Sequence, residues 1–498
     1  MTAILVLDIG TSGVRSAVVD ETATIVVERF AEFLPDTPFD GIVEYDAVTY
    51  NALAISVARD VLEDYRQTPG VTDPEIDAIG ISNQRASTVV WDRHTGVPVA
   101  PAQSWQDLRT IGDCLALQAA GHWTAPNQSI TKAANIWNSV DPERERDLCI
   151  GTPDSWLVWS LTEGAAHITE PTNVALTGFC ELSGVDWNPE LLALVDISEA
   201  ALPRIVDSSG ELAWATVFGP GRDGRGIPIC GIAGDQQASL IGQGGLELGV
   251  AKLTFGTGAM LDISLGSQRP LEAIRSEGGT FPIICWQLDG EQTWGLEAVM
   301  LSCGTNVQWL RDDLRLIETS ADSETVAAQC ESTDGVVYVP AQLGLATPHW
   351  DYGARGTLLG LTRGTGRPQV VRAVLEGIAH RALDLIEAAE DDGGTRIEVI
   401  RVDGAMSDND LFVQLVADIT GRTVEVSPVR DATAIGAAML AGLALGVWSS
   451  PEACTRLFKP RSVVLPDPDL DREAMRRQWA KAIDRARGWY EDLSALDF

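Results

Sequence analysis

The feature that most constrains the fold is a strand–turn–strand pattern that occurs twice. Residues 3–9, AILVLDI, form an apolar run that leads into a Gly-Thr-Ser-Gly turn, and a second apolar run follows at 15–19. Residues 251–264, AKLTFGTGAMLDIS, repeat this design about 245 residues later around a Gly-Thr-Gly turn at 256–258. Buried strands on both sides of a glycine turn predict two β-hairpins. Their repetition predicts two related halves.

Elsewhere in the chain, apolar segments alternate with helical patterns. The segments suited to parallel strands are at 76–82, 227–235, 335–341 and 396–405. The helical patterns cover 47–66, 236–242, 296–317, 367–391 and 407–420. This alternation predicts α/β domains with mostly parallel sheets.

Two large domains are expected, because 498 residues are about twice what one hydrophobic core supports. The stretch GQGGLELGV at 242–250 precedes the second hairpin and is the candidate boundary, which gives domains at 1–245 and 246–498. From about residue 466 the chain is charged and helical, and this tail is expected to pack on the outside. The longest apolar run, 432–448, is rich in Ala and Gly and predicts a buried helix rather than a bilayer span.

The charge of the chain argues against two classes of partner. Its 71 acidic and 36 basic residues give a formal net charge of −35, which repels nucleic-acid phosphates and anionic membrane surfaces. We therefore expect neither as a partner. Charge alone leaves open whether the acidic surface is an adaptation to high salt or only keeps the protein soluble. Eight cysteines without a CxxC pattern, and an N-terminus without a basic region, are typical of a cytoplasmic protein with reduced thiols.

The familiar nucleotide-binding motifs are absent from the sequence. There is no GxxxxGK[ST] loop, no GxGxxG after a strand and no protein-kinase HRD loop. Any nucleotide phosphates must then be bound by backbone N–H groups of small-residue turns, which glycine allows to approach closely. The two hairpin turns offer Thr11, Ser12, Gly256, Thr257 and Gly258. Either turn alone is more typical of an ordinary hairpin, and the repetition favours a shared function in ligand binding.

Two aspartates follow apolar segments in a position that suits a ligand site. Asp8 and Asp235 each stand at the carboxyl end of a predicted strand, which is the edge where open α/β sheets bind ligands. A carboxylate there can hold Mg²⁺ or accept a proton from a substrate hydroxyl. For Asp235 a helix N-cap is an equally good interpretation, because GDQQASLIGQG is typical of a helix start.

Two further segments carry side chains suited to small ligands. Arg85 lies in a polar turn after a predicted strand and Trp105 follows in SWQDLRT, a combination that stacks on and hydrogen-bonds a polyhydroxyl ligand. In VDGAMSDN, the backbone of Gly404 and Ala405 could lie against an adenine, with Asn409 donating a hydrogen bond. A structural tryptophan and a plain strand-to-helix connection are the alternatives.

Several segments follow one another in the order and spacing of a known family: DIGTSGVR, NQR, SWQDLRT, DSWLVW, GIAGDQQASL, TFGTG, QWLRD, GLATPHWDYGARGTLLGLTRGT and VDGAMSDN. Together they resemble the FGGY carbohydrate kinases from about residue 4 to about residue 448, most closely the glycerol kinases. The resemblance implies an α/β fold of two actin-like, RNase-H-like domains with a cleft between them. The first domain would bind mainly the substrate and the second mainly ATP.

The resemblance also implies an activity and site residues. The activity is ATP- and Mg²⁺-dependent phosphorylation of a hydroxyl of a small polyol or sugar, in a homodimer or homotetramer. Asp235 would be the general base, and Asp8 would hold Mg²⁺ together with it. The nucleotide would be surrounded by Thr11, Arg15, Thr257, Gly304, Gln308, Gly404, Ala405 and Asn409.

The substrate-contacting positions match only in part. Arg85, Trp105, Asp235 and Gln236 agree with the glycerol kinases. Three positions differ, in that the Glu of NQRE, a pocket Tyr and the Phe after the second turn are replaced by Ala86, Asn127 and Met260.

A lost carboxylate leaves space and unmet hydrogen bonds, each worth ~1–3 kcal/mol when buried. We therefore expect a tetritol, a pentitol or a ketose rather than glycerol. Glycerol itself, and a non-catalytic regulator that binds ATP and a sugar, are the alternatives.

Overall fold

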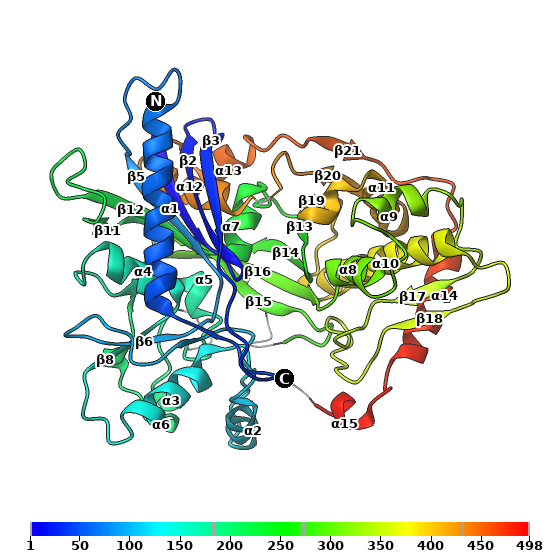
Figure 1. Cartoon of the computed structure of the whole chain (residues 1–498), viewed down its shortest axis with the longest axis horizontal. Helices are drawn as coiled ribbons and strands as arrows, with labels where there is room; N and C mark the ends of the chain where they lie inside the picture. Colours follow the sequence, from blue (N-terminus) through cyan, green and yellow to red (C-terminus); the bar gives the residue numbers. More distant parts are fainter. Residues whose placement is uncertain (1, 181–184, 271–274, 431, 497–498) are drawn as a thin grey trace.

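Two mixed β-sheets form the centres of the two halves of the chain (Figure 1). The computed structural model describes residues 2–180, 185–270, 275–430 and 432–496. The first sheet contains, in spatial order, β11 (Ser209–Ala215), β12 (Ile227–Gly234), β5 (Ala78–Asn83), β1 (Ala3–Ile9), β2 (Gly13–Asp20) and β3 (Ile25–Glu32). The second contains β15 (Phe281–Leu288), β16 (Glu291–Met300), β14 (Ala259–Gly266), β13 (Val250–Phe255), β19 (Val399–Asp403), β20 (Thr423–Val426) and β21 (Ser462–Val464).

The two sheets repeat the same order of strand directions. The predicted hairpins are β1–β2 and β13–β14, and both are antiparallel, as are the next pairs outward, β2–β3 and β14–β16. On the other side of each hairpin two parallel pairs follow, β1–β5–β12 and β13–β19–β20, before an antiparallel edge strand, β11 or β21. The repetition predicted from the two glycine turns is therefore confirmed, with β15 as an extra strand.

Helices and four short strand pairs surround these sheets. The helices before β13 are α1 (Ala47–Gln67), α2 (Ile111–Ala119), α3 (Ser129–Val140), α4 (Pro153–Leu161), α5 (Pro171–Val174), α6 (Pro189–Leu194) and α7 (Asp235–Gly242). Those after it are α8 (Gly304–Asp312), α9 (Asp322–Ala327), α10 (Arg367–Gly393), α11 (Asp410–Thr420), α12 (Thr433–Ala444), α13 (Pro451–Thr455), α14 (Arg472–Ala486) and α15 (Glu491–Ser494). The short pairs are β4 (Glu44–Tyr45) with β7 (Ala102–Gln103), β6 (Val89–Asp92) with β8 (Leu148–Gly151), β9 (Ile168–Thr169) with β10 (Arg204–Ile205), and β17 (Val337–Val339) with β18 (Thr357–Leu359).

The apolar run 432–448 forms the buried helix α12, as predicted. Although it follows the second hairpin in sequence, α12 packs on the first sheet and on α7, and its apolar side chains share a buried cluster with Ile4 and Val6 of β1. Leu5 and Leu7 face the opposite side of the sheet, in the core that includes α1. Among the described residues, no helix combines the length and the apolar character that crossing a bilayer requires.

Two strand and helix predictions are wrong. The helix expected at 296–317 is divided, because β16 continues to Met300 and α8 begins only at Gly304. Pairing with β14 on one side and β15 on the other places 296–300 in a sheet despite its helical pattern. The segment 335–341 contains a strand, β17, but it pairs antiparallel with β18 outside the large sheets.

The tail helix α14 packs on the second half through one face. Trp479 is buried there and its ring stacks on His380 of α10, with ring centroids 4.9 Å apart. Its indole nitrogen also donates to the carboxylate of Asp384, 3.1 Å away. Burial lowers the pKa of His380 to about 4, because the charged imidazole would lose its water in this contact.

We predict that Gly436→Ala destabilises the protein by about 1–3 kcal/mol, because overpacking costs that much in a rigid contact. A Cβ at Gly436 would overlap the backbone oxygen of Ala238 and push α12 away from α7. Urea denaturation measures the change. The matched control is Gly112→Ala in α2, where a Cβ would meet nothing within 4 Å. Equal stability of the two variants would contradict the close approach.

We predict that His380→Phe removes a pH-dependent component of stability. The folded pKa lies near 4 and an unfolded histidine titrates near 6.5, so the unfolded chain binds more protons between these values. Because of this histidine, the free energy of unfolding of the wild type should fall by about 2 kcal/mol between pH 7.5 and pH 5. The variant should not show this fall. Urea denaturation at both pH values tests this, with exposed His94→Asn as the control. Parallel pH dependence of wild type and His380→Phe would refute the assignment.

Candidate active site

The strand register brings Asp8 and Asp235 to the same edge of the first sheet. Asp8 is opposite Ser82 of β5, and Ser82 is in turn opposite Ala233 of β12, two residues before Asp235. Because the three strands are parallel, the backbones of Asp8 and Ala233 are separated by two strand spacings, roughly 10 Å. Burial raises the pKa of the nearby Tyr50 phenol, and the negative charges of Asp8 and Asp235 both add to this rise. The two carboxylates therefore face a common region.

Asp235 does not cap the helix that follows it. α7 begins at Asp235 itself, its N-cap is Gly234, and the cap makes no side-chain hydrogen bond. The carboxylate instead accepts a hydrogen bond from the backbone N–H of Gln236, at 2.8 Å. Burial raises the pKa of Asp235, while the charges of Arg85 and Lys252 oppose the rise. A carboxylate in this state is a better proton acceptor than an exposed aspartate.

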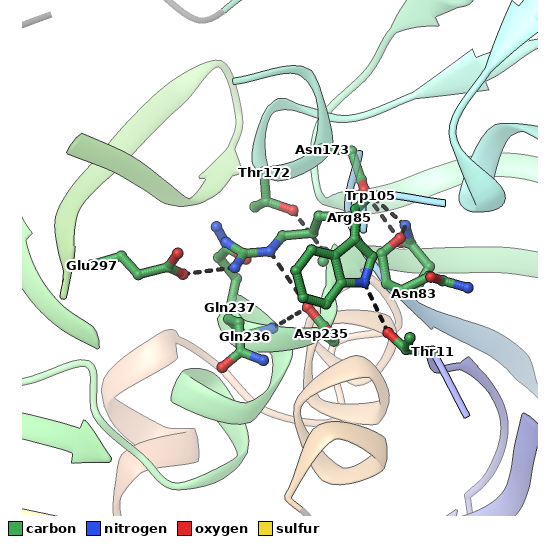
Figure 2. Close-up of polar contacts among 12 residues, drawn as sticks. Thr11, Asn83, Arg85, Trp105, Thr172, Asn173, Asp235, Gln236, Gln237 and Glu297 are labelled. Atoms are coloured by element: carbon green, nitrogen blue, oxygen red, sulfur yellow. Dashed lines mark hydrogen bonds and ion pairs between the residues drawn. The ribbon is translucent and has the colours of Figure 1, made fainter. Parts of the chain in front are cut away.

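Arg85 is the centre of the polar contacts at this edge (Figure 2). Its Nη2 donates to Oε2 of Glu297 at 2.7 Å, and its Nε lies 3.4 Å from Oδ1 of Asp235. Its Nη1 donates to Oε1 of Gln237 at 3.3 Å. Glu297 belongs to β16 of the second sheet, so this guanidinium joins the two halves of the molecule.

The turn of the first hairpin meets the predicted tryptophan. The indole Nε1 of Trp105 donates to Oγ1 of Thr11, 3.0 Å away, as Figure 2 shows. Ser12 is exposed at the tip of the same turn. Arg15 lies farther along β2, within 3.9 Å of Glu28. The structure thus brings Trp105 to the turn that follows Asp8.

In the second half, the small-residue segments converge on the other hairpin turn. The N–H of Gly304 donates to the carbonyl of Gly256 at 2.9 Å, and the N–H of Cys303 to that of Thr257 at 2.9 Å. Gly404 packs against Phe255 so closely that a Cβ would overlap the Phe255 carbonyl, and its φ of 85° suits glycine. The turn that ends at Gly258, the start of α8 and the loop before α11 therefore form one surface.

Some of the side chains predicted to surround the nucleotide are exposed, whereas Asn409 already makes hydrogen bonds within the protein. Thr257, Gln308 and Ala405 are exposed around these segments. Asn409 caps α11, since its Oδ1 accepts from the N–H of Phe412 at 2.8 Å, and its Nδ2 donates to Ser323 at 3.2 Å. A nucleotide contact from Asn409 would have to use the remaining Nδ2 hydrogen.

The three positions that differ from the glycerol kinases lie in different local environments. Ala86 is buried and adopts a left-handed φ of 61°, and its carbonyl accepts a hydrogen bond from Ser129 at 2.9 Å. Asn127 is exposed two residues earlier than Ser129. Met260 is half-buried on β14, opposite Thr254 of β13.

Sequence reasoning missed Lys252, Asp262 and Glu297, which the structure places beside Arg85 and Gln236. Lys252 donates from Nζ to Oδ2 of Asp262 at 2.9 Å and to Oε1 of Gln236 at 2.6 Å. A signal was available for the first two, because both interrupt apolar strands and are equally far from the middle of the Gly-Thr-Gly turn. No local pattern indicated that Glu297 would meet Arg85.

Comparisons with known proteins agree over the whole chain. Residues 3–242 match the N-terminal domain, and residues 251–445 the C-terminal domain, of the FGGY family of carbohydrate kinases. The chain is 39% identical to a glycerol kinase of Deinococcus radiodurans, covering 99% of both, and 40% identical to one of Halorhodospira halophila, covering 98% of this chain and 97% of the other.

Solved structures show the same architecture. A crystal structure of Plasmodium falciparum glycerol kinase with ADP has a TM-score of 0.88 at 28% identity and covers 98% of each chain. A xylulose kinase of Lactobacillus acidophilus shares the fold, with a TM-score of 0.85 at 19% identity, covering 97% of this chain and 98% of the other. With its two actin-like α/β halves, the chain belongs to the FGGY family of carbohydrate kinases and is a phosphotransferase that acts on a hydroxyl acceptor.

Proposed function

We propose that this kinase transfers the γ-phosphoryl group of ATP to a hydroxyl of a polyol or sugar other than glycerol, with Asp235 as general base. The observation that carries this proposal is the position of Asp235. It is free of a helix-capping role, lies 3.4 Å from Arg85, and shares a sheet edge with Asp8. Arg85 supplies directional donors beside it for a polyhydroxyl substrate.

The reaction needs positioning and a proton acceptor more than covalent assistance. The substrate hydroxyl oxygen forms a bond to the γ-phosphorus, the bond to the bridging oxygen of ADP breaks, and the hydroxyl proton passes to Asp235. Arg85 holds the carboxylate of Asp235 toward the substrate, and the backbone N–H of Gln236 fixes its orientation. The raised pKa of Asp235 suits this role.

The nucleotide fits the small-residue turns of both halves. The tight packing of Gly404 on Phe255, and the bonds of Gly304 to Gly256, leave main chain without bulky side chains where phosphates and adenine would lie. Asp8 and Asp235 have the oxygen ligands that Mg²⁺ prefers, and the ion would neutralise phosphate charge when bound. On this proposal, 1–245 binds mainly the substrate and 246–498 mainly ATP, although α12 packs back onto the first sheet.

Substrate choice follows from position 86. The small, buried Ala86 leaves the region beside Arg85 without the carboxylate that NQRE sequences carry. A four- or five-carbon polyol or a ketose would use that space better than glycerol. Glycerol is the second candidate, favoured by the names of relatives that are 39–40% identical.

We predict that Asp235→Asn loses at least a hundredfold in turnover but still binds ATP, because general-base catalysis contributes about 10²–10⁴-fold. Steady-state ADP release and nucleotide titration measure the two properties. Asp384→Asn is the matched control. Asp384 also forms an ion pair with an arginine, Arg381, at 2.6 Å, but it is not part of the candidate site. Normal turnover of Asp235→Asn would reject the role of Asp235.

We predict that the wild type prefers one of erythritol, xylitol, ribitol, xylulose and ribulose over glycerol. We also predict that Ala86→Glu shifts this preference about tenfold toward glycerol, because a carboxylate that pairs with a substrate hydroxyl contributes ~1–3 kcal/mol. Substrate-dependent ADP release across the panel tests both, with Ala86→Gln as a control of similar size without charge. Glycerol as the best substrate of the wild type would contradict the role given to Ala86.

A further inference from the structure

Three charged side chains form a row across the second sheet. Lys252 of β13 is directly opposite Asp262 of β14, which is directly opposite Glu297 of β16. Side chains at opposed positions share one face of an antiparallel sheet. All three are buried, whereas the adjacent row (Leu253, Leu261 and Ala298) lies in the apolar core on the other face.

The charged row contacts the substrate-side residues of the first half. Glu297 accepts the 2.7 Å hydrogen bond from Nη2 of Arg85. Lys252, held by Asp262, donates at 2.6 Å to Gln236. Each of the two acidic residues in this row, Asp262 and Glu297, therefore restrains one polar side chain of the first half, directly or through Lys252.

These contacts decide which atoms of Gln236 and Arg85 are left for a ligand. An ammonium group only donates, so it must meet the oxygen of the Gln236 amide, and the amide nitrogen becomes the free donor. Glu297 holds Nη2 of Arg85 while Asp235 lies against its Nε, which fixes the plane of the guanidinium. Both side chains are thereby preorganised as donors to substrate oxygens.

We propose that Asp262 and Glu297 are positioning residues for substrate recognition, which set the orientation of Gln236 through Lys252 and of Arg85 directly. This proposal rests on the proposed phosphorylation of a polyol or sugar. It means that the second half, expected to bind mainly ATP, also determines how the first half presents its donors to the substrate.

The row is costly to the fold, which supports a role beyond stability. Asp262 and Glu297 are carboxylates on directly opposed positions, an arrangement that is repulsive. Burial raises the pKa of Asp262, and Glu297 adds to the rise while Lys252 and Arg85 oppose it. Oδ1 of Asp262 also has no hydrogen-bond partner among the described residues. Apolar side chains of similar volume in place of a buried ion pair are often neutral or stabilising.

The test compares Glu297→Gln with the double replacement Lys252→Met and Asp262→Leu. We expect each to raise the KM for the best polyol at least tenfold, with a smaller change in kcat and an ATP KM within twofold of the wild type. Glu297→Asp should recover part of the loss. The double replacement removes both charges together, so it should keep a melting temperature close to that of the wild type and remain informative if Glu297→Gln does not fold.

A matched control and a binding measurement separate this proposal from the proposed function. Glu390→Gln disrupts a partly buried ion pair, 2.8 Å long, between Glu390 of α10 and Arg422, and should leave the polyol KM unchanged. Calorimetric titration of the polyol reports recognition without turnover. Binding without phosphorylation by the wild type would reject the proposed function alone. Folded variants with unchanged polyol affinity would overturn the positioning role, and a wild type that binds no polyol would overturn both.

Discussion

The parallel register of β1, β5 and β12 is the constraint on which the candidate site depends. It places Asp8 level with Ala233, so that the chain leaves β12 and delivers Asp235 at the same sheet edge. Arg85, which follows β5 between these strands, then contacts both Asp235 and Glu297 of the second sheet. A shift of one residue in the register of β12 would turn the side chains of this strand to the other face.

The sequence predicted the parts of the fold that are encoded locally. Glycine turns between apolar runs mark the hairpins, and the all-round apolar character of α12 marks a buried helix. The helix predicted at 296–317 was wrong in its first residues. Their apolar spacing suits a helix, but they pair with the neighbouring strands β14 and β15. Antiparallel pairing of β17 depends on β18, which lies about twenty residues later and gave no strong strand signal.

The candidate site was predictable to the extent that family motifs carry it. Thr11, Trp105, Arg85 and Asp235 were identified from short segments, and the structure pairs Trp105 with Thr11 and Arg85 with Asp235. Glu297 could not be identified in this way, because its partner Arg85 is 212 residues away and the contact exists only when both sheets are assembled. Asn409 was assigned to the nucleotide, yet its position after a 3₁₀ turn makes it first of all the cap of α11.

The repeated sheets also show how two similar halves can acquire different roles. The pair Val6–Ala17 of the first hairpin occupies the same place relative to its turn as Lys252–Asp262 does in the second. In the first sheet that face is covered by the apolar helix α12, which excludes charge. In the second sheet the equivalent face meets Gln236 and Arg85, whose polar groups can satisfy charged partners. What packs on each sheet, rather than the sheet itself, therefore decides whether a strand position contributes to the core or to the site.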